Sequence, residues 1–223
     1  MTPDPTPIAL ITGGQGALAR ATAAALQAAG WRVDAPSHSE LDVTSAPAVA
    51  AWFATHPQAY DLVIHSAGQI EDQLLLKMDP ASFDRVLAVH LGGAFRIARA
   101  ALPAMMQRQQ GHLIWIGSLS AYTGPAGQAA YAAAKAGLEG WGKSLAREVG
   151  ADGIRINGVL PGFLDTPMTA SLLADADQRR RILAQHTLGR LNTVEDAARF
   201  IVFLHSLPHV SGQVFQLDSR IRG

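Results

Sequence analysis

The 223-residue sequence predicts an α/β fold built on a parallel sheet in a single domain. The first observation is an apolar strand at residues 8–11 that runs into a glycine-rich turn and then into the helix-forming stretch 20–29. The second is a set of short apolar runs, at residues 61–65, 112–117 and 153–160, whose length and branched content are typical of buried parallel strands. The third is a hydrophobic content of 48%, which is enough for one sizeable core.

The composition also excludes several classes of function. Lysine plus arginine and aspartate plus glutamate both number 18, so no global basic field favours nucleic acid or an anionic membrane as partner. The chain has no cysteine, which excludes disulfides, thiol catalysis and cysteine metal sites, and we expect no metal. Residues 1–7 read as a flexible proline-rich tail before one domain at 8–223, with no signal peptide and no bilayer-length apolar run. We therefore expect a cytoplasmic protein.

The turn after the first strand has the spacing of a dinucleotide-binding loop. Gly14, Gly16 and Ala19 fit the G-x-G-x-x-G/A pattern, in which glycines allow a pyrophosphate to approach the backbone at a helix N-terminus. The pattern alone is weak, but a strand precedes it and a helix follows. The predicted cofactor contacts here are Thr12, Gly13, Gly14, Gln15, Gly16, Ala17 and Leu18.

The end of the second strand, at residues 31–35, bears on the choice of cofactor. An acidic residue there holds the adenosine ribose in NAD sites, and Asp34 is a candidate by distance. Register against the glycine loop instead places Ser37 and His38 at the strand tip, where they tolerate a 2′-phosphate, so NADP is favoured over NAD. Residues 41–44 follow the second strand after only a few residues, so the chain has little room here for the usual further helix and strand. Asp42, beside Val43, either caps the next helix or accepts a hydrogen bond from the adenine amino group.

Two further segments contribute candidates. The fourth strand ends in Ser66, Ala67 and Gly68, small residues that suit a backbone passing under a cofactor ribose. A helix at 45–55 precedes this strand, and a long helix at 80–109 follows it, with Asp79 as N-cap. His90 lies in the middle of that long helix. It is either a buried core or interface histidine or part of the catalytic site.

The stretch from Ser118 to Lys135 has the parts of a proton-delivery site. Ser118 follows the strand at 112–117, at the carboxyl edge where open α/β sheets bind ligands. Tyr131 and Lys135 are four residues apart on the alanine-rich helix 128–149, so they share one face. A lysine ammonium beside a tyrosine lowers the phenol pKa, and a serine hydroxyl can hold a substrate carbonyl oxygen. The alternative is an alanine-rich core helix with an unrelated Tyr and Lys.

The C-terminal third continues the strand and helix alternation. After the strand at 153–160 comes a turn whose backbone and Thr166 are expected on the nicotinamide side of the cofactor, the alternative being a simple Pro-Gly turn. The contacts expected there are Pro161, Gly162, Leu164 and Thr166. Residues 167–189 read as a polar substrate lid. A helix beginning near Thr193 and a last strand at 214–217 complete the chain.

Taken together, these motifs resemble the short-chain dehydrogenase/reductase superfamily, and most of all the 3-oxoacyl-[acyl-carrier-protein] reductases. The segments that carry the resemblance are 127–137, 143–149, 161–166 and 182–191. The resemblance implies a single-domain Rossmann-like, doubly wound parallel sheet of about seven strands with helices on both faces. It also implies NAD(P)H-dependent ketone reduction. Tyr131 would donate the proton, Ser118 would position the oxygen, and Lys135 would lower the Tyr131 pKa and bind the nicotinamide ribose. His90 stands where the family has an asparagine that supports a water-mediated proton relay.

The chain departs from the family pattern at several positions. Ala17 and Ala19 occupy two of the family's glycine positions. His65 and Ser66 replace two asparagines, so the amides that tie the strand ends together are expected to be absent. Gln109 and Asp152 stand where arginines beside the cleft would receive an acidic carrier protein, although Arg108 and Arg147 could compensate.

The expected function is reduction of a 3-oxoacyl thioester, linked to acyl carrier protein or to coenzyme A. The alternatives are a reductase or dehydrogenase of another small ketone or secondary alcohol, such as a polyketide intermediate or a sugar, and a non-catalytic cofactor-binding partner. The resemblance and two alanine-rich helices further predict a homo-oligomer, a tetramer or a dimer.

Overall fold

The computed structural model describes residues 6–221, and in this part of the chain six parallel strands form one sheet. The strand order is β2-β1-β3-β4-β5-β6, and β1 pairs with both β2 and β3. The chain therefore adds β2 on one side of β1 and then β3 on the other side. In doubly wound sheets, ligands bind at the point where the strand order reverses in this way. The strands are β1 (Ile8–Thr12), β2 (Arg32–Asp34), β3 (Leu62–His65), β4 (Gly111–Ile116), β5 (Ile154–Leu160) and β6 (Val214–Gln216).

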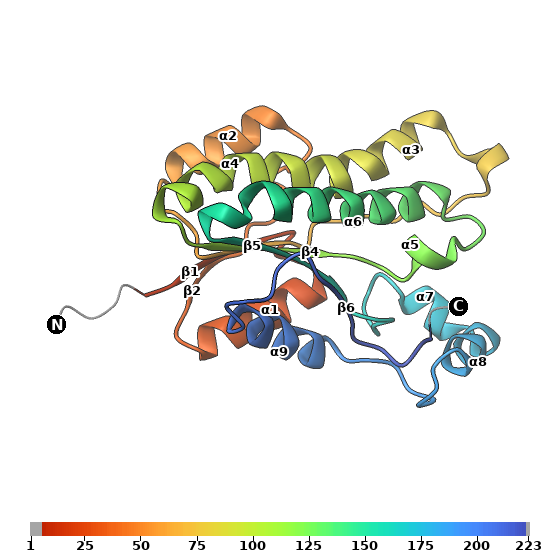
Figure 1. The fold of residues 1–223 in the computed structure, drawn as a ribbon. Helices are drawn as coiled ribbons and strands as arrows, with labels where there is room; N and C mark the ends of the chain where they lie inside the picture. Colours follow the sequence, from red (N-terminus) through yellow and green to blue (C-terminus); the bar gives the residue numbers. More distant parts are fainter. Residues whose placement is uncertain (1–5, 222–223) are drawn as a thin grey trace.

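Helices cover both faces of the sheet (Figure 1). One face carries α2 (Ala46–Thr55), α3 (Pro80–Leu87), α4 (Gly93–Arg108) and α6 (Ala129–Val149), and the larger core cluster joins the sheet to α2, α4 and α6. The other face carries α1 (Ala17–Ala28) and α9 (Val194–His205), which pack on the second cluster. Strand residues alternate between the two clusters, for example Leu10 and Ile11, because successive side chains of a strand point to opposite faces.

The sheet has six strands among the described residues, so the expectation of about seven is corrected. The missing strand belongs between β2 and α2, where residues 35–45 make turns only. Leu41 and Val43 are buried there but pair with no strand. A parallel crossover takes a dozen or more residues, and this segment is too short to supply both a crossover and a strand.

The predicted long helix 80–109 is interrupted by a π-turn, η2 (Ala88–Gly92). Asp79 caps the start of α3 as predicted, because its side chain accepts a hydrogen bond from the Ala81 amide. His90 lies inside the π-turn. Such turns are inserted at single points of α-helices and are frequent at functional sites.

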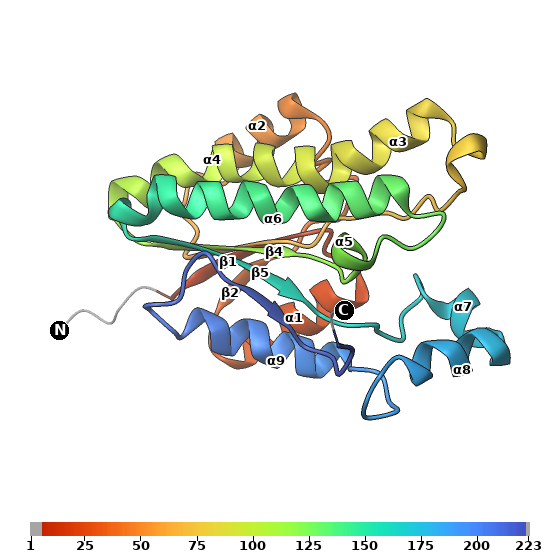
Figure 2. The same cartoon turned by 45° about the vertical axis from the view of Figure 1, so that its right-hand side comes forward.

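The remaining helical segments are short and mostly follow the carboxyl ends of the strands. These segments are η1 (Leu75–Lys77), α5 (Ser120–Thr123), η3 (Gly150–Asp152), α7 (Ala170–Ala174) and α8 (Ala176–Ala184). Figure 2 shows α5, α7 and α8 at the end of the sheet to which the strand arrows point. Within residues 6–221, no helix combines the length and the apolar character needed to cross a bilayer. Most of the predicted tail, residues 1–5, lies outside the described part.

Candidate active site

The strand β4 and the helix α6 bring Ser118, Tyr131 and Lys135 together, as the sequence predicts. Ser118 follows the carboxyl end of β4 and hydrogen-bonds Tyr131. The Lys135 ammonium is buried, donates to the Ile116 carbonyl at 2.7 Å, and lies 5.4 Å from the centre of the Tyr131 ring. The three side chains are therefore grouped at the carboxyl edge of the sheet.

Burial controls the ionisation of this group. Burial raises the pKa of the Tyr131 phenol above its usual value, the hydrogen bond with Ser118 lowers it, and the Asp72 carboxylate raises it. Burial lowers the pKa of Lys135 to about 7. The ammonium of Lys135 is directed to the Ile116 carbonyl, so the expected lowering of the Tyr131 pKa by Lys135 stays a prediction for the cofactor-bound state. At neutral pH the phenol carries its proton and can donate it.

A chain of polar side chains that the sequence reasoning missed supports Ser118. Its hydroxyl donates to Ser120 Oγ at 3.1 Å, and the Ser120 hydroxyl donates to Gln128 Oε1 at 2.8 Å. Gln128 in turn donates from Nε2 to the Asp72 carboxylate at 2.7 Å. The only signal in the sequence is the Ser-x-Ser spacing after β4. The chain fixes the hydroxyl of Ser118 before a substrate arrives.

His90 is a buried histidine beside Tyr131, and a catalytic role for it stays a prediction. Its ring is buried and lies edge-on to Tyr131 with centroids 5.2 Å apart, and its Nε2 lies 2.9 Å from the carbonyl oxygen and 3.3 Å from the amide nitrogen of Gln69. Nδ1 is buried without a hydrogen-bond partner among the described residues. Burial lowers the His90 pKa to about 2, so the ring is neutral at working pH. A Cβ at Gly68 would clash with this ring, which explains the small residue there.

The glycine loop fits a pyrophosphate. The Gly14 amide donates to the Pro36 carbonyl at 2.9 Å, and a Cβ at Gly14 would collide with the Ala35 carbonyl. Gly13 adopts a φ of 69°, in the left-handed region. Gly16 is the N-cap of α1 with no side-chain cap, and the first turn contains no acidic residue. The first N–H groups of α1 and its positive dipole end are thus uncompensated and suited to an anion.

At and after the end of β2, where the sequence predicts the adenosine end of the cofactor, the predicted residues differ in their contacts within the protein. Asp34 is the last residue of β2 and not inside the strand as expected, and its carboxylate accepts a hydrogen bond from the Tyr60 hydroxyl at 2.9 Å. Ser37 donates from its amide and its hydroxyl to the Glu40 carboxylate at 2.8 and 2.7 Å. His38 beside it is exposed. The sequence reasoning missed Glu40, which brings a negative charge to the strand tip.

Asp42 does not cap α2. Its carboxylate accepts from the amide and the hydroxyl of Thr44, at 2.8 and 2.7 Å, and the N-cap of α2 is Ser45. The capping alternative is therefore wrong, because the preceding turn already uses this carboxylate. The adenine alternative stays a prediction. Val43 beside it is buried in the core.

Two side chains that the sequence reasoning did not identify donate hydrogen bonds to backbone carbonyls of the turn at 161–166. Asn192 donates to the Pro161 carbonyl at 2.7 Å, and Thr169 donates to the Leu164 carbonyl at 2.6 Å. Gly162 has a φ of 91°, which only glycine adopts without strain. The turn has a fixed shape after β5, with Thr166 in its last position.

The asparagine amides are absent as expected, and a histidine makes hydrogen bonds in their place: His65 bonds Thr12 on β1 and the His90 carbonyl, each at 3.1 Å. One expectation drawn from the departures is corrected. Gln109 and Asp152 do not flank this site. Each lies just before a strand begins, and Gly153 packs against the Gln109 backbone. They therefore lie at the amino edge of the sheet, and Arg108 there is paired with Asp61 at 3.1 Å.

Comparisons with known proteins agree with this geometry. A family model described as "Enoyl-(Acyl carrier protein) reductase" matches residues 11–219. The chain is 35% identical to 3-oxoacyl-[acyl-carrier-protein] reductase FabG of Escherichia coli (strain K12), over 95% of each protein. It is 41% identical to the FabG of Pseudomonas aeruginosa, over 74% of this chain and 68% of that protein.

A solved structure with the same architecture is a putative gluconate dehydrogenase from Agrobacterium tumefaciens. The TM-score is 0.90 at 26% identity, and the match covers 96% of this chain and 94% of the other.

Proposed function

The chain belongs to the short-chain dehydrogenase/reductase family of NAD(P)-dependent oxidoreductases that act on CH–OH and C=O groups, and from this premise we propose a 3-oxoacyl thioester reductase. The substrate would be linked to acyl carrier protein or coenzyme A, and the product would be the 3-hydroxyacyl thioester. The observation that carries the proposal is the grouping of Ser118, Tyr131 and Lys135 at the carboxyl edge of the sheet. The names of the relatives supply the substrate class.

In the proposed ketone reduction, each residue of the site has a separate role. Bound NADPH supplies the hydride to the ketone carbon. Tyr131 gives its phenolic proton to the carbonyl oxygen, while the Ser118 hydroxyl holds that oxygen within reach. Lys135 binds the nicotinamide ribose, and the charge of that ammonium favours the phenolate left on Tyr131. The ketone thereby gains one hydride and one proton.

The cofactor would lie along the carboxyl edge of the sheet. The glycine loop and the N-terminus of α1 would hold the pyrophosphate, and residues 66–68 and 161–166 would flank the nicotinamide half. We propose NADPH in preference to NADH because Ser37 and His38 lie in the turn after β2, where their side chains would tolerate a 2′-phosphate.

The surroundings of the site suit a substrate with an apolar part. The loop before α3 exposes Leu74, Leu75 and Leu76, at 57, 70 and 99% of their surface. On the segment after β5, Met168 is 55% exposed. Apolar side chains exposed on segments next to a site favour an acyl chain over a small polar ketone.

The proposal is tested by NADPH and NADH oxidation with acetoacetyl-CoA as the thioester. We expect turnover by the wild type and a loss of about a thousand-fold or more in Tyr131→Phe, since the proton donor is removed. NADPH binding, followed by fluorescence, should persist in Tyr131→Phe. Tyr122→Phe is the matched control, because Tyr122 is exposed on α5 and bonds Glu139. A wild type that binds NADPH but leaves acetoacetyl-CoA unchanged would contradict the thioester assignment.

The putative gluconate dehydrogenase neighbour favours a second candidate, a dehydrogenase of secondary alcohols such as sugar acids. The same three catalytic residues would then run in the oxidative direction. Reduction of NADP or NAD by gluconate, with acetoacetyl-CoA inert, would select this candidate. Tight cofactor binding without turnover of any ketone or alcohol would select a non-catalytic cofactor-binding partner.

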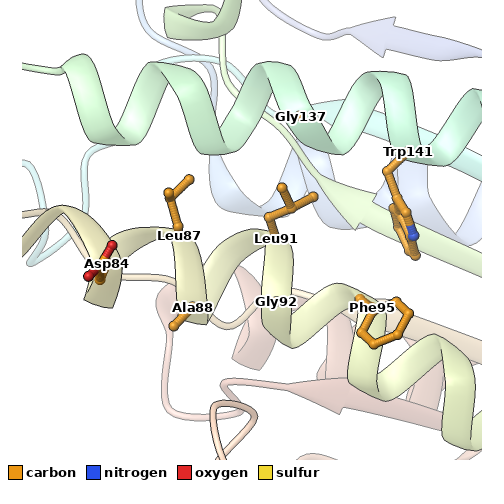
Figure 3. A pocket seen from close by; sticks show the side chains of 8 residues that line it. All are labelled: Asp84, Leu87, Ala88, Leu91, Gly92, Phe95, Gly137 and Trp141. Carbon is orange, nitrogen blue, oxygen red and sulfur yellow. The ribbon is translucent and has the colours of Figure 1, made fainter.

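We also propose that the protein is a homo-oligomer, a tetramer or a dimer, that associates through α3, α4 and α6. A groove of about 530 Å³ runs between α6 and the α3–α4 pair, and its walls are apolar (Figure 3). Leu87, Leu91, Phe95 and Trp141 line it, and Phe95 is 49% exposed. Exposed apolar surface of this kind is typical of an interface between subunits.

The oligomer is tested by light scattering at micromolar protein concentration. We expect Phe95→Asp to lower the mass to that of a smaller assembly, because it places a charge in the groove. Phe203→Asp is the matched control, since Phe203 is 56% exposed on α9 at the opposite face. A wild type with the mass of a monomer would refute the proposal.

A further inference from the structure

We propose that His65 is a positioning residue that joins the cofactor loop and the π-turn of His90 into one hydrogen-bonded unit. The kinetic part of this inference rests on the proposed function. His65 ends β3, in register with Thr12 at the end of β1. Its ring reaches the Thr12 side chain with one nitrogen and the His90 carbonyl with the other, each at 3.1 Å.

The hydrogen bonds around Thr12 fix the tautomer of His65. The Thr12 hydroxyl oxygen accepts from the amides of Ser66 and Ala67, both at 3.2 Å. A hydroxyl has two acceptor positions and one proton, so its proton goes to Nδ1 of His65. The neutral ring then carries its own proton on Nε2, which donates to the His90 carbonyl. Each proton in this chain of hydrogen bonds then has an acceptor.

The surroundings hold the ring in this neutral form. His65 is 2% exposed, and a Cβ at Gly93 would press on its Cε1 atom. Burial and the Lys135 charge lower its pKa to about 4. A protonated ring would place a second donor opposite the Thr12 hydroxyl proton and break the chain. The ring therefore works as a fixed spacer between two elements.

This spacer connects the two halves of the proposed site. On one side Thr12 fixes the amides at residues 66 and 67, where the cofactor ribose is expected to lie. On the other side the His90 carbonyl belongs to the π-turn, whose ring packs edge-on to Tyr131. An asparagine at position 65 carries its amide atoms one bond from Cγ, whereas Nε2 of histidine lies two bonds away. Asparagine can thus replace the link to Thr12 but falls short of the His90 carbonyl.

Because leucine replaces neither hydrogen bond and asparagine replaces only one, the two substitutions should affect NADPH binding and turnover differently. For His65→Leu we expect the NADPH Kd to rise about ten-fold or more and kcat to fall about ten-fold or more, since both buried hydrogen bonds are lost. For His65→Asn we expect the NADPH Kd to stay within about three-fold of wild type while kcat falls about ten-fold. Thr12→Val, which removes the hydroxyl that bonds His65, tests the first link if His65→Leu fails to fold.

A measurement on the cofactor-free protein separates this inference from the proposed function. Nitrogen-15 NMR of the histidines should show His65 with an unprotonated Nδ1 and a protonated Nε2. Protonation on Nδ1, or wild-type NADPH Kd and kcat in His65→Leu, would overturn the positioning role. Failure of the proposed function instead shows in the wild type, which would leave every ketone unchanged while the tautomer still holds.

Discussion

Glu40 places a negative charge in the turn after β2, beside the proposed adenosine end of the cofactor site. Its carboxylate is held at the strand tip by the amide and hydroxyl of Ser37, and these hydrogen bonds lower its pKa below the usual value. The charge is therefore present at neutral pH. In the proposed cofactor site this carboxylate would face a 2′-phosphate.

We expect Glu40→Gln to shift the cofactor preference toward NADPH by several-fold in kcat/KM, since like charges repel. Steady-state kinetics with NADPH and NADH measure the ratio. Glu148→Gln is the control, because Glu148 lies at the far end of α6, where it accepts from Ser144. An unchanged ratio in Glu40→Gln would mean that the carboxylate does not face the adenosine ribose.

The sequence was sufficient for Ser118, Tyr131 and Lys135, because strand ends and helix spacing determine where these side chains lie. It was insufficient for Gln128 and Asn192, whose partners Asp72 and Pro161 lie 56 and 31 residues away. A hydrogen bond between distant residues leaves no periodic trace in a sequence. The hydrogen bonds of His65 were not predicted for the same reason, since its two partners lie 53 and 25 residues away.

At the scale of elements, the packing of α6 against the sheet depends on where its glycines lie. Gly142 on α6 and Gly158 on β5 both face the buried Trp115 ring, and a Cβ at either position would overlap it. The indole therefore fills a space that two glycines leave between helix and sheet. Gly140, two residues earlier on the same helix, faces open space.

These glycines make a matched pair. We expect Gly142→Ala to destabilise the protein by about 2 kcal/mol or more, because the packed core has no room for a methyl group. Gly140→Ala should stabilise it by up to about 1 kcal/mol, through helix propensity alone. Urea denaturation of both variants gives the two free energies of unfolding. The packing account fails if the two substitutions have the same sign.

The element pattern was largely predictable, since apolar runs, N-caps and glycine turns are local signals. Asp79 and Thr193 cap their helices as their sequence positions indicate. The π-turn at Ala88–Gly92 was not predictable, because the flanking residues read as one continuous helix. It is stabilised by tertiary contacts, among them the bond from His65 to the His90 carbonyl.

At the scale of the whole molecule, buried histidines make the fold sensitive to acid. Burial lowers the pKa of His65 and His205 to about 4 and that of His90 to about 2, and it holds that of His112 well below its usual value. All four are neutral in the folded protein. In the unfolded chain they take up protons below pH about 6.5.

We therefore expect stability to be constant with respect to these groups above pH about 6.5 and to fall as the pH drops toward about 4. Each histidine contributes a slope of at most about 1.4 kcal/mol per pH unit, because the unfolded state binds one more proton. Urea midpoints between pH 5 and 7.5 measure the slope. His65→Asn should reduce it by one such contribution, and an unchanged slope would contradict the burial of a neutral His65.

The missing strand leaves β2 as the outermost strand of the sheet, with one row of backbone groups unpaired by any described strand. Such a row can pair with the same row of another molecule and start aggregation. Here the strand is only three residues long and reads Arg32-Val33-Asp34, with charged residues at both ends. Two copies that met at this edge could form only a few backbone hydrogen bonds with each other. Shortness and charge at this border thus help to keep concentrated protein in solution, where a longer apolar strand would invite fibres.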